Sequence, residues 1–111
     1  MVGEPHWITE PSEEYLTAEG LMKETFGDHY GNIVIGEEEG LNLLYSVVST
    51  PNDFDRYEGL QWHASAEYAR SNPTDPDVAE LVERVAGSRE SYLRWGRNTL
   101  GWAIYLFRKP E

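Results

Sequence analysis

The chain has 111 residues, 40% of them hydrophobic and 13% aromatic, which fits one folded domain spanning residues 1–111 and excludes a disordered acidic chain. The absence of cysteine excludes disulfides and thiolate metal sites and favours a reducing compartment, with the cytoplasm as the default, while no apolar run approaches the roughly 18 residues of a membrane span. The net charge of −11 lies within residues 1–58, which hold thirteen acidic residues against two basic ones, whereas residues 59–111 hold seven of each. Such a one-sided negative field excludes direct nucleic-acid and membrane binding and favours a basic protein surface as the partner.

Residues 1–11 contain two prolines and little periodicity, so we expect an irregular N-terminal arm pinned by Trp7 and Ile8. Ser12 is placed to cap a helix that carries Glu13 and Glu14 in its first turn and ends near Gly27. Because an interior glycine is costly in a helix, Gly20 leaves open a break into two short helices.

Residues 32–35 and 41–49 are rich in β-forming side chains and are joined by a segment with glycine at both ends. This pattern predicts a β-hairpin whose acidic tip holds Glu37, Glu38 and Glu39. Both faces of the second strand are apolar, as expected of a buried central strand. Residues 51–59 are predicted to form a polar loop.

Apolar and polar side chains alternate over residues 60–68, which predicts a strand with one buried, apolar face and one solvent-exposed, polar face. Residues 72–76 predict a turn before a helix that presents Val78, Leu81, Val82 and Val85 on one face and ends at Gly87. Residues 92–95 fit either a second helix or a strand, and we favour the strand. The aromatic run 102–107 predicts a final strand.

Taken together, these elements predict a single α+β domain. The expected architecture is an antiparallel sheet of four to five strands with two helices packed on one face.

The predicted strand 60–68 places His63, Ser65 and Glu67 together on its solvent-exposed face. Side chains two residues apart along a strand are about 6 to 7 Å apart, which suits proton transfer or phosphate binding. A solvated polar face is the simpler interpretation, because phosphodiesterases that use this His-x-Ser pattern need a second copy of it and the chain has none.

Other polar groups point to ordinary surface chemistry. Glu24, Asp28 and His29 lack the spacing of a metal site, and residues 37–39 lack a calcium-loop pattern. With no glycine-rich phosphate loop, we expect neither metal nor cofactor. Four arginines are expected to pair with the acidic half, within the chain or across a homo-oligomer: Arg84, Arg89, Arg94 and Arg97.

The stretch 59–110 contains Trp62 and Ser65 in a predicted strand, Pro73 and Pro76 in a turn, and a terminal Leu106-Phe107-Arg108-Lys109-Pro110. In this pattern it resembles a family of small uncharacterised phage and bacterial proteins. The resemblance implies a phage-related origin and no established activity.

These observations lead to the hypothesis of a small acidic protein-binding module, phage-encoded and host-directed if the resemblance holds. It would dock a basic surface, such as that of a nucleic-acid-binding protein, through Glu13, Glu14, Glu37, Glu38, Glu39 and Trp7. One alternative is a small enzyme acting through His63, Ser65 and Glu67. The other is a self-assembling structural protein in which the acidic half of one copy meets the arginines of another.

Overall fold

Strand β3 (Leu100–Arg108) lies at the centre of a three-stranded antiparallel sheet in a computed structural model that describes residues 1–111. It pairs with β1 (Val2–Trp7) on one side and with β2 (Asn42–Val48) on the other. The predicted final strand and the α+β class are therefore confirmed. The expected sheet of four to five strands with two helices is wrong on both counts, because only three segments pair and four helices of seven residues or more accompany them.

Residues 2–7 form strand β1, so the predicted irregular arm is wrong over most of its length. The strand pairs with a segment almost a hundred residues away, with Val2 opposite Tyr105 and Trp7 opposite Leu100. Pro5 is tolerated because β1 lies at the edge of the sheet, where one side needs no backbone donor.

The first helix, α1 (Glu13–Glu19), begins as predicted: the Ser12 hydroxyl accepts a hydrogen bond from the Tyr15 backbone N–H at 3.1 Å. It ends at Gly20, whose φ of 65° is in the left-handed region that glycine adopts readily. A 3₁₀ turn over Lys23–Thr25 follows. The break at Gly20 that the sequence left open is the observed outcome, and the continuous helix to Gly27 is not.

Helix α2 (His29–Glu38) replaces the predicted first strand of the hairpin. Asp28 caps it, because its Oδ1 accepts a hydrogen bond from the Gly31 N–H at 2.6 Å. Strand β2 is where the sequence predicts one, but it is an edge strand with exposed Tyr45 and Val47 rather than a buried central strand.

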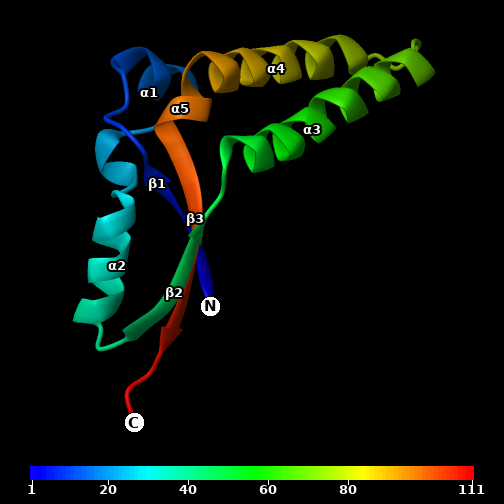
Figure 1. The fold of residues 1–111 in the computed structure, drawn as a ribbon. Helices are drawn as coiled ribbons and strands as arrows, with labels where there is room; N and C mark the ends of the chain where they lie inside the picture. Colours follow the sequence, from blue (N-terminus) through cyan, green and yellow to red (C-terminus); the bar gives the residue numbers. More distant parts are fainter.

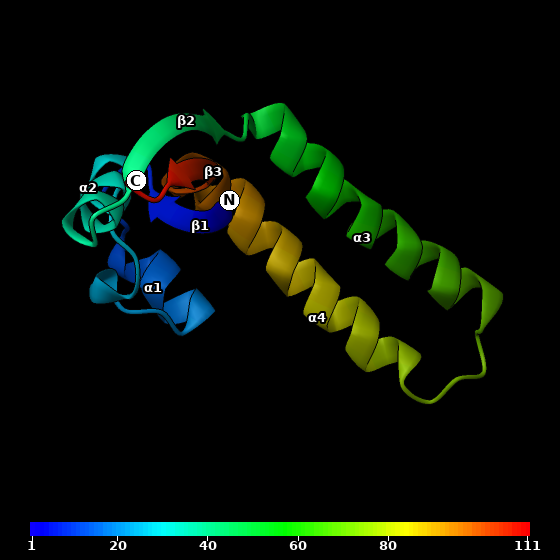
Figure 2. The same ribbon diagram turned by 90° about the horizontal axis from the view of Figure 1, so that it is seen from below.

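Two long helices, α3 (Pro51–Ser71) and α4 (Val78–Ser91), form an antiparallel hairpin (Figure 2). Helix α3 covers both the predicted loop 51–59 and the predicted strand 60–68, so both predictions are wrong. It starts at a capping box in which the Thr50 and Asp53 side chains each accept a hydrogen bond from the other residue's backbone N–H. The turn before α4 is confirmed, whereas Gly87 lies inside α4 and does not end it.

Residues 92–96 form a single turn of π-helix, Tyr92–Gly96, and lead through the short α5 (Arg97–Thr99) into β3. The favoured strand over 92–95 is therefore wrong, and the helical alternative is nearer the structure. The hairpin α3–α4 projects from one end of the sheet, as Figure 1 shows, and gives the chain dimensions of 60 × 30 × 22 Å.

The core is small: thirteen of the 111 residues are buried. One cluster contains Trp7, Tyr15 and Leu16, and the other lies where α2 covers Ala103 and Tyr105 on one face of β3. The opposite face of β3 carries exposed Trp102, Ile104 and Leu106. No helix of the chain combines the length and apolar composition needed to cross a bilayer.

Candidate functional site

The end of the sheet from which α3 and α4 project carries a polar network centred on Asp55 of α3. Arg97 of α5 donates to both carboxylate oxygens of Asp55, from Nε at 3.0 Å and from Nη2 at 3.1 Å. The Tyr92 hydroxyl donates to Asp55 Oδ1 at 2.8 Å. The network therefore joins α3, the π-helix and α5, and holds the π-helix turn at the sheet end.

Hydrogen bonding and burial explain the pKa shifts found in this network. The hydrogen bonds from Arg97, and then from Tyr92, lower the pKa of Asp55. Burial, followed by the neighbouring Asp55, raises the pKa of Tyr92. At neutral pH the network is thus an ionised carboxylate held by a guanidinium and a phenol. This confirms, for Arg97, the expected pairing of an arginine with the acidic half within the chain.

A cavity of about 510 Å³ lies where β2 runs into α3. It is lined by Ser49, Asp53, Phe54, Tyr57 and Trp102. Its lining is mainly aromatic. Its one carboxylate, Asp53, already accepts the Thr50 N–H at 2.9 Å as part of the capping box, which leaves the cavity suited to an apolar or aromatic group.

A second polar cluster lies between α2 and the sheet. His29 Nδ1 is 2.9 Å from the Tyr105 hydroxyl, which also accepts a hydrogen bond from Asn32 Nδ2 at 3.3 Å. The buried His6 lies beside His29, with ring centroids 5.3 Å apart, and its Nδ1 has no hydrogen-bond partner. Burial, and then His29, lowers the pKa of His6, whereas Asp28 opposes the shift. We find no group of three or more His, Cys, Asp or Glu side chains placed to hold a metal ion.

His63, Ser65 and Glu67 do not share a face. They lie on helix α3, where successive residues turn by about 100°, so His63 and Glu67, four residues apart, share one face and Ser65 lies on another. Ser65 is buried, whereas His63 and Glu67 are exposed and Glu67 pairs with Arg70 at 2.7 Å. The arrangement that motivated a catalytic site is therefore absent.

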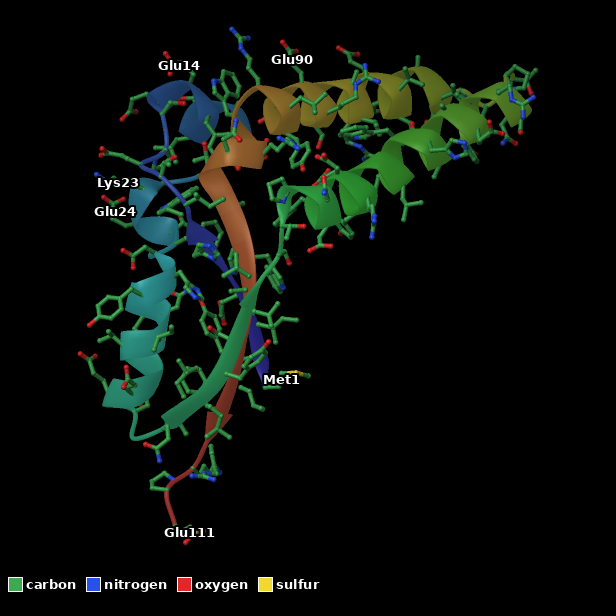
Figure 3. All side chains as sticks on the ribbon, viewed as in Figure 1. Met1, Glu14, Lys23, Glu24, Glu90 and Glu111 are labelled. Atoms are coloured by element: carbon green, nitrogen blue, oxygen red, sulfur yellow. The ribbon has the colours of Figure 1, made fainter.

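The acidic residues predicted to bind a partner are exposed but separated. Glu13 and Glu14 lie in the first turn of α1, and Figure 3 shows Glu14 on its outer side. Glu37, Glu38 and Glu39 lie at the C-terminal end of α2 rather than at a hairpin tip. Trp7, expected as an exposed contact, is only 8% exposed and its Nε1 donates to the Lys23 carbonyl at 2.9 Å, so that expectation is wrong.

Sequence reasoning missed Asp55, Tyr92 and Arg97 as a unit. The capping box of Thr50 and Asp53 was the available signal, because it marks the start of a helix and would have placed Asp55 and Glu58 on its first turns. The pairing with residues of the π-helix and α5 had no local signal, since it depends on how the hairpin returns to the sheet.

No family model matches the chain. The uncharacterised protein YjhP of Escherichia coli K12 is 25% identical over 107 residues, which are 95% of this chain and 43% of YjhP. The crystal structure of E. coli YjhP superimposes with a TM-score of 0.89 at 24% identity, over 98% of this chain and 45% of that one.

Two S-adenosyl-L-methionine (SAM)-dependent methyltransferases solved with S-adenosyl-L-homocysteine superimpose equally well. The protein from Geobacter sulfurreducens has a TM-score of 0.88 at 21% identity, and that from Thiobacillus denitrificans has 0.88 at 23%. Each match covers 97% of this chain and 44% of the methyltransferase. The chain has the fold of part of these proteins. It spans less than half the length of the relatives it matches.

These findings overturn two hypotheses. The resemblance to a phage family confined to residues 59–110 is wrong, because the similarity to YjhP covers nearly the whole chain. The hypothesis of a small acidic docking module is also wrong, because the chain has the fold of part of a methyltransferase. The same comparison also contradicts the two alternative hypotheses. These were the enzyme built on His63 and the self-assembling structural protein.

Proposed function

We propose that this chain forms one part of a SAM-dependent methyltransferase. The observation that carries the proposal is the superposition on two methyltransferases, each bound to S-adenosyl-L-homocysteine, with a TM-score of 0.88 over 97% of the chain. In each of them this fold accounts for 44% of the protein. The proposed role is therefore that of a segment that works together with the remainder of such a fold.

The exposed apolar surface of the sheet supports this role. Ile104 is 42% exposed and lies opposite Val47 in the register, and Leu106 lies opposite Tyr45. With Trp102, these side chains make up an apolar face on the side of the sheet away from α2; we call it the open face. An exposed apolar sheet face is unfavourable in water and is expected where another layer of structure packs.

The dimensions of the chain agree with the same conclusion. Its radius of gyration is 17.6 Å, whereas a compact domain of this length would have about 13 Å. The difference comes from the α3–α4 hairpin, which projects away from the sheet (Figure 1). A projecting hairpin and an open face are features of a piece of structure that packs against neighbouring elements.

The 510 Å³ cavity does not by itself fit the methyl donor. It has aromatic walls and one carboxylate, which already accepts a hydrogen bond from the Thr50 backbone. Nothing in it would hold the amino-acid moiety of SAM through paired charges. We therefore assign this chain a structural role around the end of the sheet, with the donor held by the remainder of the methyltransferase fold.

A chimera tests the proposal. The segment of the Geobacter methyltransferase that superimposes on this chain is replaced by this chain, and binding of S-adenosyl-L-homocysteine is measured by titration calorimetry. We expect the chimera to fold, as judged by circular dichroism, and to retain binding. A folded chimera without binding would contradict the proposal.

A matched pair of substitutions makes the test specific to the open face. Ile104 on β3 and Val82 on α4 are 42% and 44% exposed, so Ile104→Lys and Val82→Lys expose a similar charge in the isolated chain. In the chimera, Ile104→Lys should lower the melting temperature and weaken binding, because the lysine is buried against the added layer. Equal effects of the two substitutions would show that nothing packs on the open face.

A further inference from the structure

A small cavity between α1, α3 and the π-helix has the features of a ligand site. Its volume is about 150 Å³, and its walls include Tyr15, Glu19, Phe54, Glu58, Tyr92 and Gly96; we call it the Tyr15 pocket. These residues come from three separate parts of the chain, brought together where the π-helix turns toward β3. Single turns of π-helix are rare and occur often at functional sites.

Tyr15 brings to the pocket a hydroxyl that makes no hydrogen bond within the chain. The residue is only 4% exposed, and its only hydrogen bond to a side chain is from its backbone N–H to Ser12 Oγ. Tyr15 lines the pocket, with Oη 3.4 Å from the point where a Cβ at Gly96, on the facing wall, would lie. Because this hydroxyl borders the pocket, it can donate a hydrogen bond to a bound ligand or accept one from it.

Two carboxylates of the pocket have no basic partner. The four ion pairs of the chain involve Lys23, Arg70, Arg94 and Arg97, and none of them reaches Glu19 or Glu58. Glu19 accepts a hydrogen bond from the Ser91 hydroxyl at 2.5 Å. Burial, and then repulsion from Glu19, raises the pKa of Glu58, and a positive charge entering the pocket would stabilise its ionised form and offset the repulsion.

We propose that the Tyr15 pocket binds a small organic ammonium ion. Glu58 and Glu19 pair with its charge, the Tyr15 hydroxyl supplies a hydrogen bond, and the rings of Phe54 and Tyr92 contact its apolar part. Anions are excluded by the two carboxylates, and a nucleotide is too large for the volume. This inference goes beyond the proposed function: it concerns a ligand held by this chain's own residues, and its test needs no methyl donor.

The test uses the 111-residue chain with two probes of similar size, n-butylammonium and its neutral isostere n-butanol, and with calcium chloride as a third. Binding is followed by chemical-shift changes of backbone amides in two-dimensional NMR. We expect n-butylammonium to shift the amides of Gly96 and Leu100, with weak affinity because so few atoms make contact. We expect n-butanol to shift them far less, because it lacks the charge.

Variants then assign the contacts. Glu58→Gln should weaken n-butylammonium binding about tenfold or more, and Tyr15→Phe about threefold to tenfold, since a charged hydrogen bond is worth more than a neutral one. Glu83→Gln, at an exposed position of α4 outside the pocket, is the control and should bind like the parent chain. Circular dichroism confirms that each variant is folded.

Three results would overturn the inference. Equal shifts with n-butanol would show a merely apolar cavity, and stronger shifts with calcium would show a metal site. No shift at Gly96 or Leu100 with n-butylammonium at tens of millimolar would show that the pocket holds no ammonium ion. If Glu58→Gln does not fold, the comparison of n-butylammonium with n-butanol on the parent chain still decides the outcome.

Discussion

Arg97 donates two parallel hydrogen bonds to Asp55, from Nε to Oδ1 at 3.0 Å and from Nη2 to Oδ2 at 3.1 Å. Such a paired arrangement fixes both the distance and the orientation of two groups. Since Asp55 is in the second turn of α3 and Arg97 is in α5, this contact ties the base of the helical hairpin to the start of β3.

Removing either partner of this pair should lower the melting temperature. In a double-mutant cycle, Asp55→Ala and Arg97→Ala should show a clear favourable coupling, because each side chain loses its only charged partner when the other is removed. The exposed pair Glu67–Arg70 on α3 is the matched control, for which we expect no measurable coupling. Thermal unfolding of the four variants of each cycle measures both, and equal couplings would contradict the assigned role of the Asp55–Arg97 pair.

Gly101→Ala should destabilise the chain by about 1–3 kcal/mol, as overpacking of a full interior does. A Cβ at this position of β3 would lie 2.6 Å from Nε2 of the buried His6 and 2.7 Å from its Cε1. Gly87→Ala in α4 is the control, because no atom lies within 4 Å of its Cβ position. It should instead stabilise the helix by about 0.5–1 kcal/mol. Urea unfolding of both variants measures the difference in the free energy of unfolding. If Gly101→Ala leaves this free energy unchanged, the His6 side chain must be able to move aside.

Tyr105→Phe should lower the free energy of unfolding by about 1 kcal/mol. The Tyr105 side chain is 1% exposed, and its hydroxyl contacts His29 Nδ1 and Asn32 Nδ2. The substitution keeps the ring but leaves both groups of α2 without that partner. Tyr30→Phe, at a residue 73% exposed on the same helix, should have no effect, and unfolding by urea compares the two.

Acidification should destabilise the fold through His6. Its pKa is lowered from the ordinary value of 6.5 by burial and then by His29, so the unfolded chain takes up a proton at a higher pH than the folded chain does. The stability contributed by neutral His6 is therefore present above about pH 6.5 and is lost as the pH falls below that value.

Urea unfolding at a series of pH values from neutral to mildly acidic measures this loss. In His6→Gln the pH dependence below 6.5 should be smaller than in the parent chain, whereas His63→Gln, at an exposed histidine, should leave it unchanged. A parent chain whose stability does not fall over this range would contradict the role of His6.

Local signals predicted the features that depend on neighbouring residues. Ser12 caps α1 and the turn before α4 lies where the prolines place it, whereas the end of α1 at Gly20 was only an open alternative to Gly27. Strand β3 was recognisable because its β-branched and aromatic side chains favour an extended backbone. In each case the free-energy preference comes from contacts within a few residues along the chain.

Helix α3 shows how a local pattern can mislead. Residues 60–68 alternate between apolar and polar side chains, but the small alanines in the alternation carry little preference for a buried face, and the capping box at Thr50 starts a helix that continues through them. Because these residues are helical, His63, Ser65 and Glu67 do not lie together on one face as they would in a strand. The prediction of a loop over residues 51–59 likewise concealed Asp55 and Glu58. These side chains face the π-helix only because residues 51–71 are helical.

By itself, the sequence determined the α+β class, the cap of α1 at Ser12, the last two strands and the concentration of negative charge in residues 1–58. Only the tertiary structure decided that residues 2–7 are a strand, that β3 is central, and that Tyr15, Glu58 and Tyr92 line one pocket. The reason is physical: a helix satisfies its backbone hydrogen bonds within itself, whereas a strand needs a partner. For β1 that partner is almost a hundred residues away, beyond the reach of any local pattern.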